Sequence, residues 1–205
     1  MIALLIILAE KGLLPDAIIR LGIKRLCAQR LAEATSSNEA EMEKEHAAWI
    51  DVLKVSPIAL VPEKANEQHY EVPPRLFELV LGNKLKYSSG FWPEGVSTLD
   101  QSEAAMLKLT TERAGLVDGQ AILELGCGWG SLTLYMAEHF PKSKITAVSN
   151  SNDQRQFIEA RCDELNLKNV EIITADMNDF ETTKLFDRVV SIEMFEHMRN
   201  YEKLL

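Results

Sequence analysis

Apolar and polar stretches alternate regularly through the second half of the chain. Four short runs rich in apolar residues are each followed by a segment with helical spacing of its apolar residues or by a polar crossover. We expect strands at 121–125, 144–148, 170–174 and 188–192, and helices at 130–139 and 153–165. Strands that alternate with helices predict a mostly parallel, Rossmann-like α/β sheet with right-handed crossovers and helices on both faces.

The first part of the chain has helical patterns instead. Helices are expected at 14–31, 39–54, 75–81 and 99–114. Thr98 can cap the last of these helices, and Gly115 can end it. We therefore predict two parts: an N-terminal helical region over residues 1–83 and a Rossmann-like domain over residues 84–205.

Composition and charge narrow the range of partners. The chain has a formal net charge of −9, which disfavours nucleic acid as a general partner because phosphate binding needs a basic face. Residues 1–9 are apolar but too few to span a membrane, and they lack the basic start of a signal peptide. The three cysteines share no disulfide or metal spacing, so we expect a cytoplasmic protein. The basic helix at 14–31 could lie on an anionic membrane surface, but a solvated basic face is the favoured interpretation.

The first expected strand runs directly into a glycine-rich turn. Glu124 lies inside the end of this strand. Gly126, Gly128 and Gly130 follow the strand, with Cys127 between the first two. Glycines allow positive φ and let a ligand lie against bare main chain. The spacing is G-x-G-x-G, unlike the G-x-G-x-x-G of dinucleotide enzymes. It suits an adenosyl group whose charge sits on a sulfonium, with no pyrophosphate to hold.

The next two strand ends carry polar residues at the edge where ligands of open α/β sheets bind. After the second strand, Ser149, Asn150 and Gln154 could hold ribose hydroxyls by neutral hydrogen bonds, in place of the usual acid. After the third strand, Asp176 stands beside Met177 and is a carboxylate partner for an adenine amino group. The alternative for Asp176 is a simple turn or cap residue, a common role for Asp.

The fourth strand end brings together two carboxylates and an imidazole: Glu193, Glu196 and His197. If the segment is helical, their spacing places them on one side. Such a group at the mouth of a cofactor site can remove a proton and hold a cation. The alternatives are a surface helix start, where Glu is favoured by the helix dipole, and a metal site, which lacks a further His or Cys pair.

Three motifs together resemble a known enzyme family. They are Glu-Leu-Gly-Cys-Gly-Trp-Gly at 124–130, Ser-Ile-Glu-Met-Phe-Glu-His-Met at 191–198 and Lys-Tyr-Ser-Ser-Gly-Phe-Trp at 86–92. The chain resembles the S-adenosylmethionine-dependent methyltransferases related to cyclopropane-fatty-acid synthase, within them the coclaurine N-methyltransferase branch. Residues 66–73 and 98–115 also fit this branch, so the resemblance covers most of the chain.

The resemblance implies a donor site for S-adenosyl-L-methionine. The donor would lie over the glycine turn, with Tyr87 and Ser88 closing over it from the N-terminal side. Residues 149–154 would hold its ribose and amino-acid portions, and Asp176 and Met177 would flank the adenine.

The resemblance also implies how an acceptor would be handled. In amine-methylating members, Glu193, Glu196 and His197 match the residues around the acceptor nitrogen. His197, aided by Glu196, would take the proton from the amine, and Glu193 would orient the amine and stabilise positive charge. Aromatic residues of the 86–92 loop could add cation–π contacts. The implied function is N-methylation of a small amine.

Two departures from the family pattern keep alternatives open. Ser89 stands where lipid-cyclopropanating members carry a Cys that helps bind a bicarbonate base, which weakens a cyclopropane-synthase interpretation. The family fold also continues through further strands after the point where this sequence stops, so we expect a truncated chain. The alternatives are a methyltransferase acting on a lipid acyl chain and an inactive cofactor-binding fragment.

Overall fold

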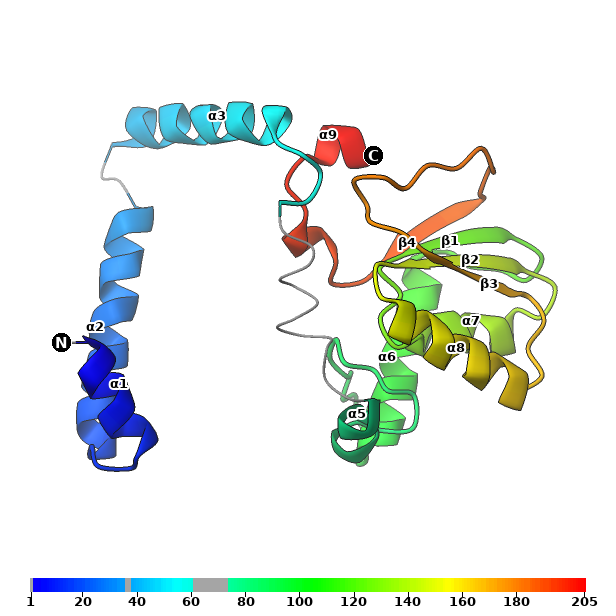
Figure 1. The fold of residues 1–205 in the computed structure, drawn as a ribbon, viewed down its shortest axis with the longest axis horizontal. Coiled ribbons are helices and arrows are strands. Elements are labelled where there is room, and N and C mark those ends of the chain that lie inside the picture. Colours follow the sequence, from blue (N-terminus) through cyan, green and yellow to red (C-terminus); the bar gives the residue numbers. More distant parts are fainter. Residues whose placement is uncertain (1, 36–37, 61–73) are drawn as a thin grey trace. The chain divides into compact units, whose positions relative to one another are not determined.

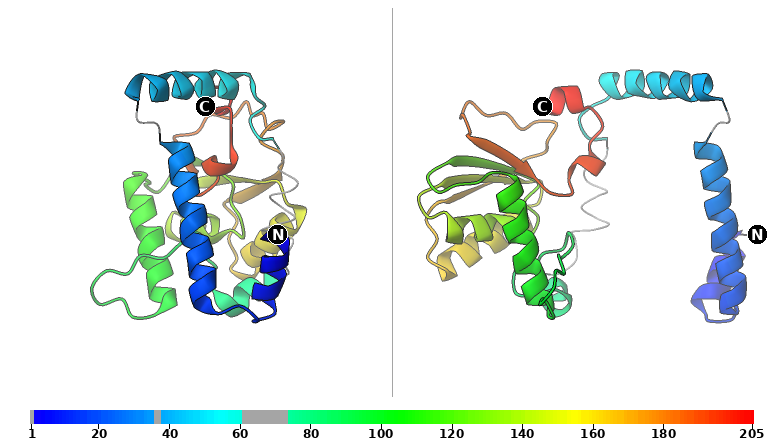
Figure 2. Two further views of the ribbon diagram at one scale, coloured as in Figure 1. Left: turned by 90° about the vertical axis from the view of Figure 1, so that its left-hand side faces the viewer. Right: turned by 180° about the vertical axis from the view of Figure 1, so that it is seen from behind.

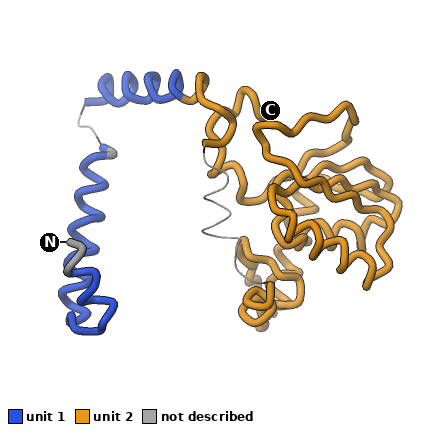
Figure 3. Tube along the Cα trace, in the orientation of Figure 1, with its two compact units in different colours: residues 1–52 blue, residues 53–205 orange. Residues whose placement is uncertain are grey.

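The structure is a computed structural model that describes residues 2–35, 38–60 and 74–205 of the 205-residue chain. The chain folds into two compact units, residues 1–52 and 53–205 (Figure 3). The predicted boundary at residue 83 stays a prediction, and the 66–73 segment lies outside the described residues.

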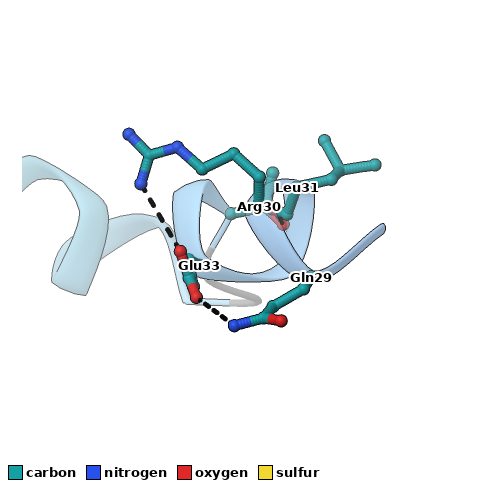
Figure 4. Close-up of polar contacts among 5 residues, drawn as sticks. Gln29, Arg30, Leu31 and Glu33 are labelled. Carbon is teal, nitrogen blue, oxygen red and sulfur yellow. Dashed lines mark hydrogen bonds and ion pairs between the residues drawn. The ribbon is translucent and has the colours of Figure 1, made fainter. Parts of the chain in front are cut away.

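The first unit is helical. It contains α1 (Ile2–Glu10), α2 (Asp16–Ala34) and most of α3 (Glu39–Val55). The polar side chains of α2 pair within the helix: Glu33 accepts a hydrogen bond from Gln29 Nε2 at 2.9 Å and pairs with Arg30 at 3.5 Å (Figure 4). Exposed pairs of this kind contribute little to stability. The solvated basic face favoured for this helix, and the alternative of contact with a membrane surface, both stay predictions. None of the described helices combines the length and apolar character needed to cross a membrane.

The second unit is built on a four-stranded sheet in which every pairing is parallel. The strands are β1 (Ala121–Leu125), β2 (Lys144–Ser149), β3 (Val170–Thr174) and β4 (Arg188–Ser191), in the spatial order β3-β2-β1-β4 (Figure 1). The predicted parallel α/β sheet is therefore confirmed, and the strand bounds agree with the expected ones to within a residue. In this order β1 lies in the interior of the sheet. From β1 the chain adds β2 and then β3 on one side, and it then crosses to the other side of β1 to add β4, so the strand order reverses between β1 and β4. Ligands of open α/β sheets bind at such a reversal, outside the carboxyl ends of the strands.

One face of the sheet is covered by α6 (Leu99–Arg113), α7 (Ser131–His139) and α8 (Asn152–Glu164) (Figures 1 and 2). A central cluster joins Leu107 of α6 and Met136 of α7 to Ile122 of β1, all at most 1% exposed. A second cluster packs Ile158 of α8 on Ala147 of β2. The capping box at the start of α6 is observed, because Thr98 accepts from the Gln101 backbone and Gln101 accepts from the Thr98 backbone.

The other face is covered by the β3–β4 connection and the C-terminal residues. Leu123, Leu125 and Val148 pack there against Met194, with Phe180, Phe186 and Leu204 around them. Leu204 belongs to α9 (Tyr201–Leu204), which follows the short 3-10 turn η1 (Phe195–His197). Asn200 ties this end to the start of the unit by donating to the carbonyls of Lys54 and Ser56, both at 2.8 Å. Helix α5 (Pro74–Val80) precedes α6.

Candidate active site

The three glycines of the turn after β1 serve different purposes. A Cβ on Gly126 would lie 2.9 Å from Met194 Cβ, and one on Gly130 would lie 2.7 Å from Ile158 Cγ1, so both glycines are needed for packing. A Cβ on Gly128 would meet nothing within 4 Å, although its φ is +53°. Gly128 is therefore the one position of the turn where bare backbone borders open space, as a cradle for a ligand requires.

Glu124 lies beneath this turn and not on its open side. Its carboxylate is 3% exposed and accepts a hydrogen bond of 2.6 Å from Thr133 Oγ1 on α7. Burial raises the pKa of Glu124 to about 7, and the hydrogen bond from Thr133 opposes that rise. Glu124 thus fixes the turn to the start of α7 and holds a carboxyl group that changes charge near neutral pH. Cys127, in the same turn, is buried against Ala147 and Ile158, and burial raises the pKa of its thiol.

The end of β2 presents a buried pair of polar side chains. Ser149 Oγ donates to Gln154 Oε1 at 2.6 Å, and the two residues are 4% and 2% exposed. The amide nitrogen of Gln154 is buried without a hydrogen-bond partner among the described residues. An unsatisfied buried donor is costly, so an acceptor such as a hydroxyl of a bound ligand would suit this place. Asn150 is exposed, and Ser151 caps α8 by accepting from the Gln154 backbone.

The end of β3 shows the turn arrangement of Asp176, and its role toward an adenine stays a prediction. Its Oδ1 accepts from the backbone and the side chain of Asn178, at 2.8 and 3.0 Å, which is the arrangement of a turn residue. Asn178 in turn exchanges two 3.0 Å hydrogen bonds with the backbone of Ala59. Oδ2 of Asp176 takes no hydrogen bond from the described residues. Met177, beside it, is half-buried against the cluster of Leu123 and its neighbours.

The end of β4 carries the acidic and imidazole cluster. Ser191 Oγ donates to the Leu125 carbonyl at 2.9 Å, and Met194, 8% exposed, packs on Gly126. These contacts hold the segment against the glycine turn. Glu193 has a φ of +51°, a conformation that non-glycine residues rarely adopt and that often occurs at functional sites.

The helical arrangement expected for this cluster is not observed. Glu196 and His197 belong to η1, a turn of only three residues, and Glu193 lies before it. The left-handed backbone at Glu193 prevents one continuous helix from running through all three positions. The three side chains still follow one another at the carboxyl end of β4, and all of them are exposed.

The loop between α5 and α6 is held by carboxylates that the sequence did not single out. Glu103 of α6, fully buried, accepts from the backbone N–H groups of Gly82, Lys84 and Lys86 at 2.8, 3.0 and 3.3 Å. Asp100, one turn earlier, accepts from the backbone and side chain of Asn83. The loop that carries Tyr87 and Ser88 is thereby fixed to the start of α6.

Tyr87 and Ser88 lie differently on this loop. The Tyr87 ring is 54% exposed and meets Phe77 of α5 edge-on, with 5.3 Å between ring centroids. Ser88 is half-buried and accepts a 2.6 Å hydrogen bond from Nζ of Lys86, which is 6% exposed. Glu103 and Thr133 support this region of the fold, and no sequence pattern singled them out. Lys86 belongs to the 86–92 motif, but nothing in the sequence indicated that its side chain is buried.

Comparison with known proteins supports the resemblance to methyltransferases that the sequence motifs indicate. Residues 61–204 match the family described as mycolic acid cyclopropane synthetase. The chain is 39% identical over 196 residues to (S)-coclaurine N-methyltransferase of Thalictrum flavum subsp. glaucum and 37% identical to that of Papaver somniferum. Each match covers 96% of this chain, and 54% and 56% of those relatives. The chain therefore spans about half the length of the curated relatives it matches.

Solved structures extend the similarity to three dimensions. A crystal structure of coclaurine N-methyltransferase bound to N-methylheliamine and SAH is 39% identical, with a TM-score of 0.89, and the match covers 99% of this chain and 58% of that one. The mycolic acid cyclopropane synthase CmaA1 with SAH and CTAB is 27% identical, with a TM-score of 0.57, over 63% of this chain and 45% of that one. The chain belongs to the mycolic acid cyclopropane synthetase family of S-adenosylmethionine-dependent methyltransferases.

Proposed function

We propose that the protein transfers a methyl group from S-adenosyl-L-methionine to the nitrogen of a small amine. The observation that carries the proposal is the seating of Met194 on Gly126. This contact places the segment of Glu193, Glu196 and His197 beside the glycine turn whose Gly128 borders open space. A donor site and a cluster able to handle protons and cations thus share one edge of the sheet.

The described residues fit the donor. Gly128 leaves the room that a ligand needs, and the buried amide nitrogen of Gln154 lacks an acceptor that a ribose hydroxyl can supply. The donor supplies a methyl group on a positively charged sulfonium. Ser149 would orient Gln154, Asp176 has Oδ2 available for an adenine amino group, and Ser88 would close the donor side. The relatives that were solved with SAH support this assignment.

The residues after β4 would prepare the acceptor. A protonated amine has no lone pair for attack, so a base must remove its proton first. His197, next to Glu196, would accept that proton, and Glu193 would hold the amine by charge attraction. Positioning of the two reactants supplies the rest of the rate enhancement. The chain spans about half the length of its N-methyltransferase relatives, so the amine substrate is likewise a proposal.

A reducing, cytoplasmic location suits the three free cysteines, two of which are buried. A lipid acyl chain is the competing acceptor, since the family also contains cyclopropane-fatty-acyl-phospholipid synthases, 34% identical over 138 residues in Escherichia coli.

S-adenosyl-L-methionine labelled in its methyl group can distinguish an amine acceptor from a lipid acceptor. The protein encoded by the full reading frame that contains these residues should be incubated with the labelled donor and, separately, with a panel of secondary and cyclic amines and with phospholipid vesicles. We expect label in an amine product. Label confined to the lipid would replace the amine proposal with the lipid alternative. Label in neither the amines nor the lipid would contradict the proposal that the protein methylates these substrates.

A further inference from the structure

Lys86 is a buried cation inside the loop that borders the proposed donor site. Its side chain is 6% exposed, although lysine is seldom fully buried unless it is paired. Its Nζ donates to Ser88 Oγ at 2.6 Å, and its backbone N–H donates to Glu103. The ammonium therefore points toward Ser88, two residues further along the same loop.

Two carboxylates act on this cation from other elements. Burial lowers the pKa of Lys86, and the charge of Glu193, followed by that of Glu103, opposes this effect. Glu103 comes from α6 and already accepts three backbone hydrogen bonds. Glu193 comes from the segment after β4, where its carboxylate is exposed. Among the described residues no carboxylate oxygen lies within the 4.0 Å of a contact ion pair with Lys86 Nζ, so Glu193 acts across a longer gap.

Burying a lysine at this place costs desolvation free energy and adds little to the stability of the fold. An apolar side chain of similar length would fill the space without burying a charge, and replacing buried charges in this way is often neutral or stabilising. Residues that lower stability while facing a site are typical of function. The side-chain contact of Lys86 points toward the proposed donor side, where its ammonium meets the Ser88 hydroxyl.

We propose that Lys86 is a positioning residue for the donor: its buried ammonium fixes the Ser88 hydroxyl toward S-adenosyl-L-methionine. The proposal rests on the proposed function. It predicts that the charge of Lys86, more than its bulk, sets the affinity for the donor.

The direct test replaces Lys86 by Met and compares Lys84→Met. Lys84 lies on the same loop and also donates its backbone N–H to Glu103, but its Nζ pairs with Glu138 of α7 at 2.7 Å. For Lys86→Met we expect roughly tenfold weaker binding of S-adenosylhomocysteine, as loss of a charge-assisted hydrogen bond implies. The melting temperature should stay unchanged or rise, whereas a merely structural lysine would lower it. Lys84→Met should leave this affinity unchanged.

Lys86→Arg separates charge from shape. Arginine keeps its proton throughout, while the lowered pKa of Lys86 means that the wild type loses this charge earlier on the alkaline side than an exposed lysine would. The affinity of the wild type for S-adenosylhomocysteine, divided by that of Lys86→Arg, should therefore fall as the pH is raised from about 7 to about 10. The ratio cancels titration of the ligand itself. If Lys86→Met does not fold, Lys86→Gln replaces it, and a folded Lys86→Gln that binds S-adenosylhomocysteine as tightly as the wild type would overturn the proposal.

A double-mutant cycle tests the link to Ser88. In a Ser88→Ala background, Lys86→Met should no longer weaken binding of S-adenosylhomocysteine, because the hydroxyl on which it acts is gone. An equal loss in both backgrounds would contradict the link. If the wild type methylates amines and a folded Lys86→Met binds S-adenosylhomocysteine normally, the Lys86 proposal alone fails. If the wild type neither binds the donor nor methylates amines, the proposed function fails and this proposal fails with it.

Discussion

The proposed donor side and the proposed acceptor side of the site are built in opposite ways. At the ends of β1 and β2, Glu124, Ser149 and Gln154 are at most 4% exposed and hydrogen-bonded to neighbouring side chains. After β4, Glu196 and His197 are exposed on a short turn, and the left-handed residue Glu193, also exposed, comes before it. The sheet itself thus fixes the polar groups on the proposed donor side, while those on the proposed acceptor side stand on an open segment that Met194 packs against the glycine turn.

The largest effect should come from filling the donor cradle. We expect Gly128→Val to abolish detectable binding of S-adenosylhomocysteine, a loss of at least roughly a thousandfold, because the branched side chain occupies the open space and strains a positive φ. Isothermal titration calorimetry measures this loss. Gly119→Val is the matched control, since Gly119 also has a positive φ and open space but lies before β1, at the opposite end of the strand. Equal losses in both variants would show that strain, and not the cradle, is responsible.

A smaller and more selective effect should follow on the acceptor side. In the protein from the full reading frame, His197→Ala should lower the rate of methyl transfer about a thousandfold at neutral pH, the size typical of a lost general base. Binding of S-adenosylhomocysteine should change by less than about twofold, because His197 lies on the exposed segment. If His197→Ala also weakened donor binding strongly, the proposed donor and acceptor sides would not act independently.

The smallest effect concerns stability beneath the glycine turn. The folded pKa of Glu124, about 7, lies above its ordinary value of 4.5, so its contribution to stability is full below about 4.5 and is lost as the pH rises through 7. This loss is about 3 kcal/mol in the free energy of unfolding. Glu124→Gln should remove this part of the pH dependence, as measured by urea unfolding between those pH values.

A second variant checks the cause of that pH dependence. Thr133 donates to Glu124 and so holds the pKa of Glu124 down, and Thr133→Val should therefore move the loss of stability to higher pH. A pH dependence of unfolding that is the same in wild type, Glu124→Gln and Thr133→Val would contradict the buried carboxyl group as its source.

The sequence predicted the sheet well because its signals are local. Each strand is a short apolar run, and the first one runs directly into glycines, so both the fold and the donor turn follow from neighbouring residues. The roles of the individual glycines could not be predicted. They depend on Met194 and Ile158, which come from distant parts of the chain.

Glu103 and the turn after β4 escaped prediction for related reasons. Glu103 is a charged residue, a type that is seldom buried, and its partners lie 17 to 21 residues earlier in the chain. The segment of Glu196 and His197 has helical spacing, but the left-handed backbone of Glu193 limits it to a 3-10 turn. Contacts across the fold, which no local pattern encodes, decide both features.

Titration of S-adenosylhomocysteine into the 205-residue chain tests the central claim most directly. If the donor side is complete within the described residues, calorimetry will show saturable binding at one site per chain, and Gly128→Val will eliminate it while Gly119→Val does not. A folded wild-type chain that gives no binding heat, with no shift of its melting temperature in the presence of the ligand, would contradict the account.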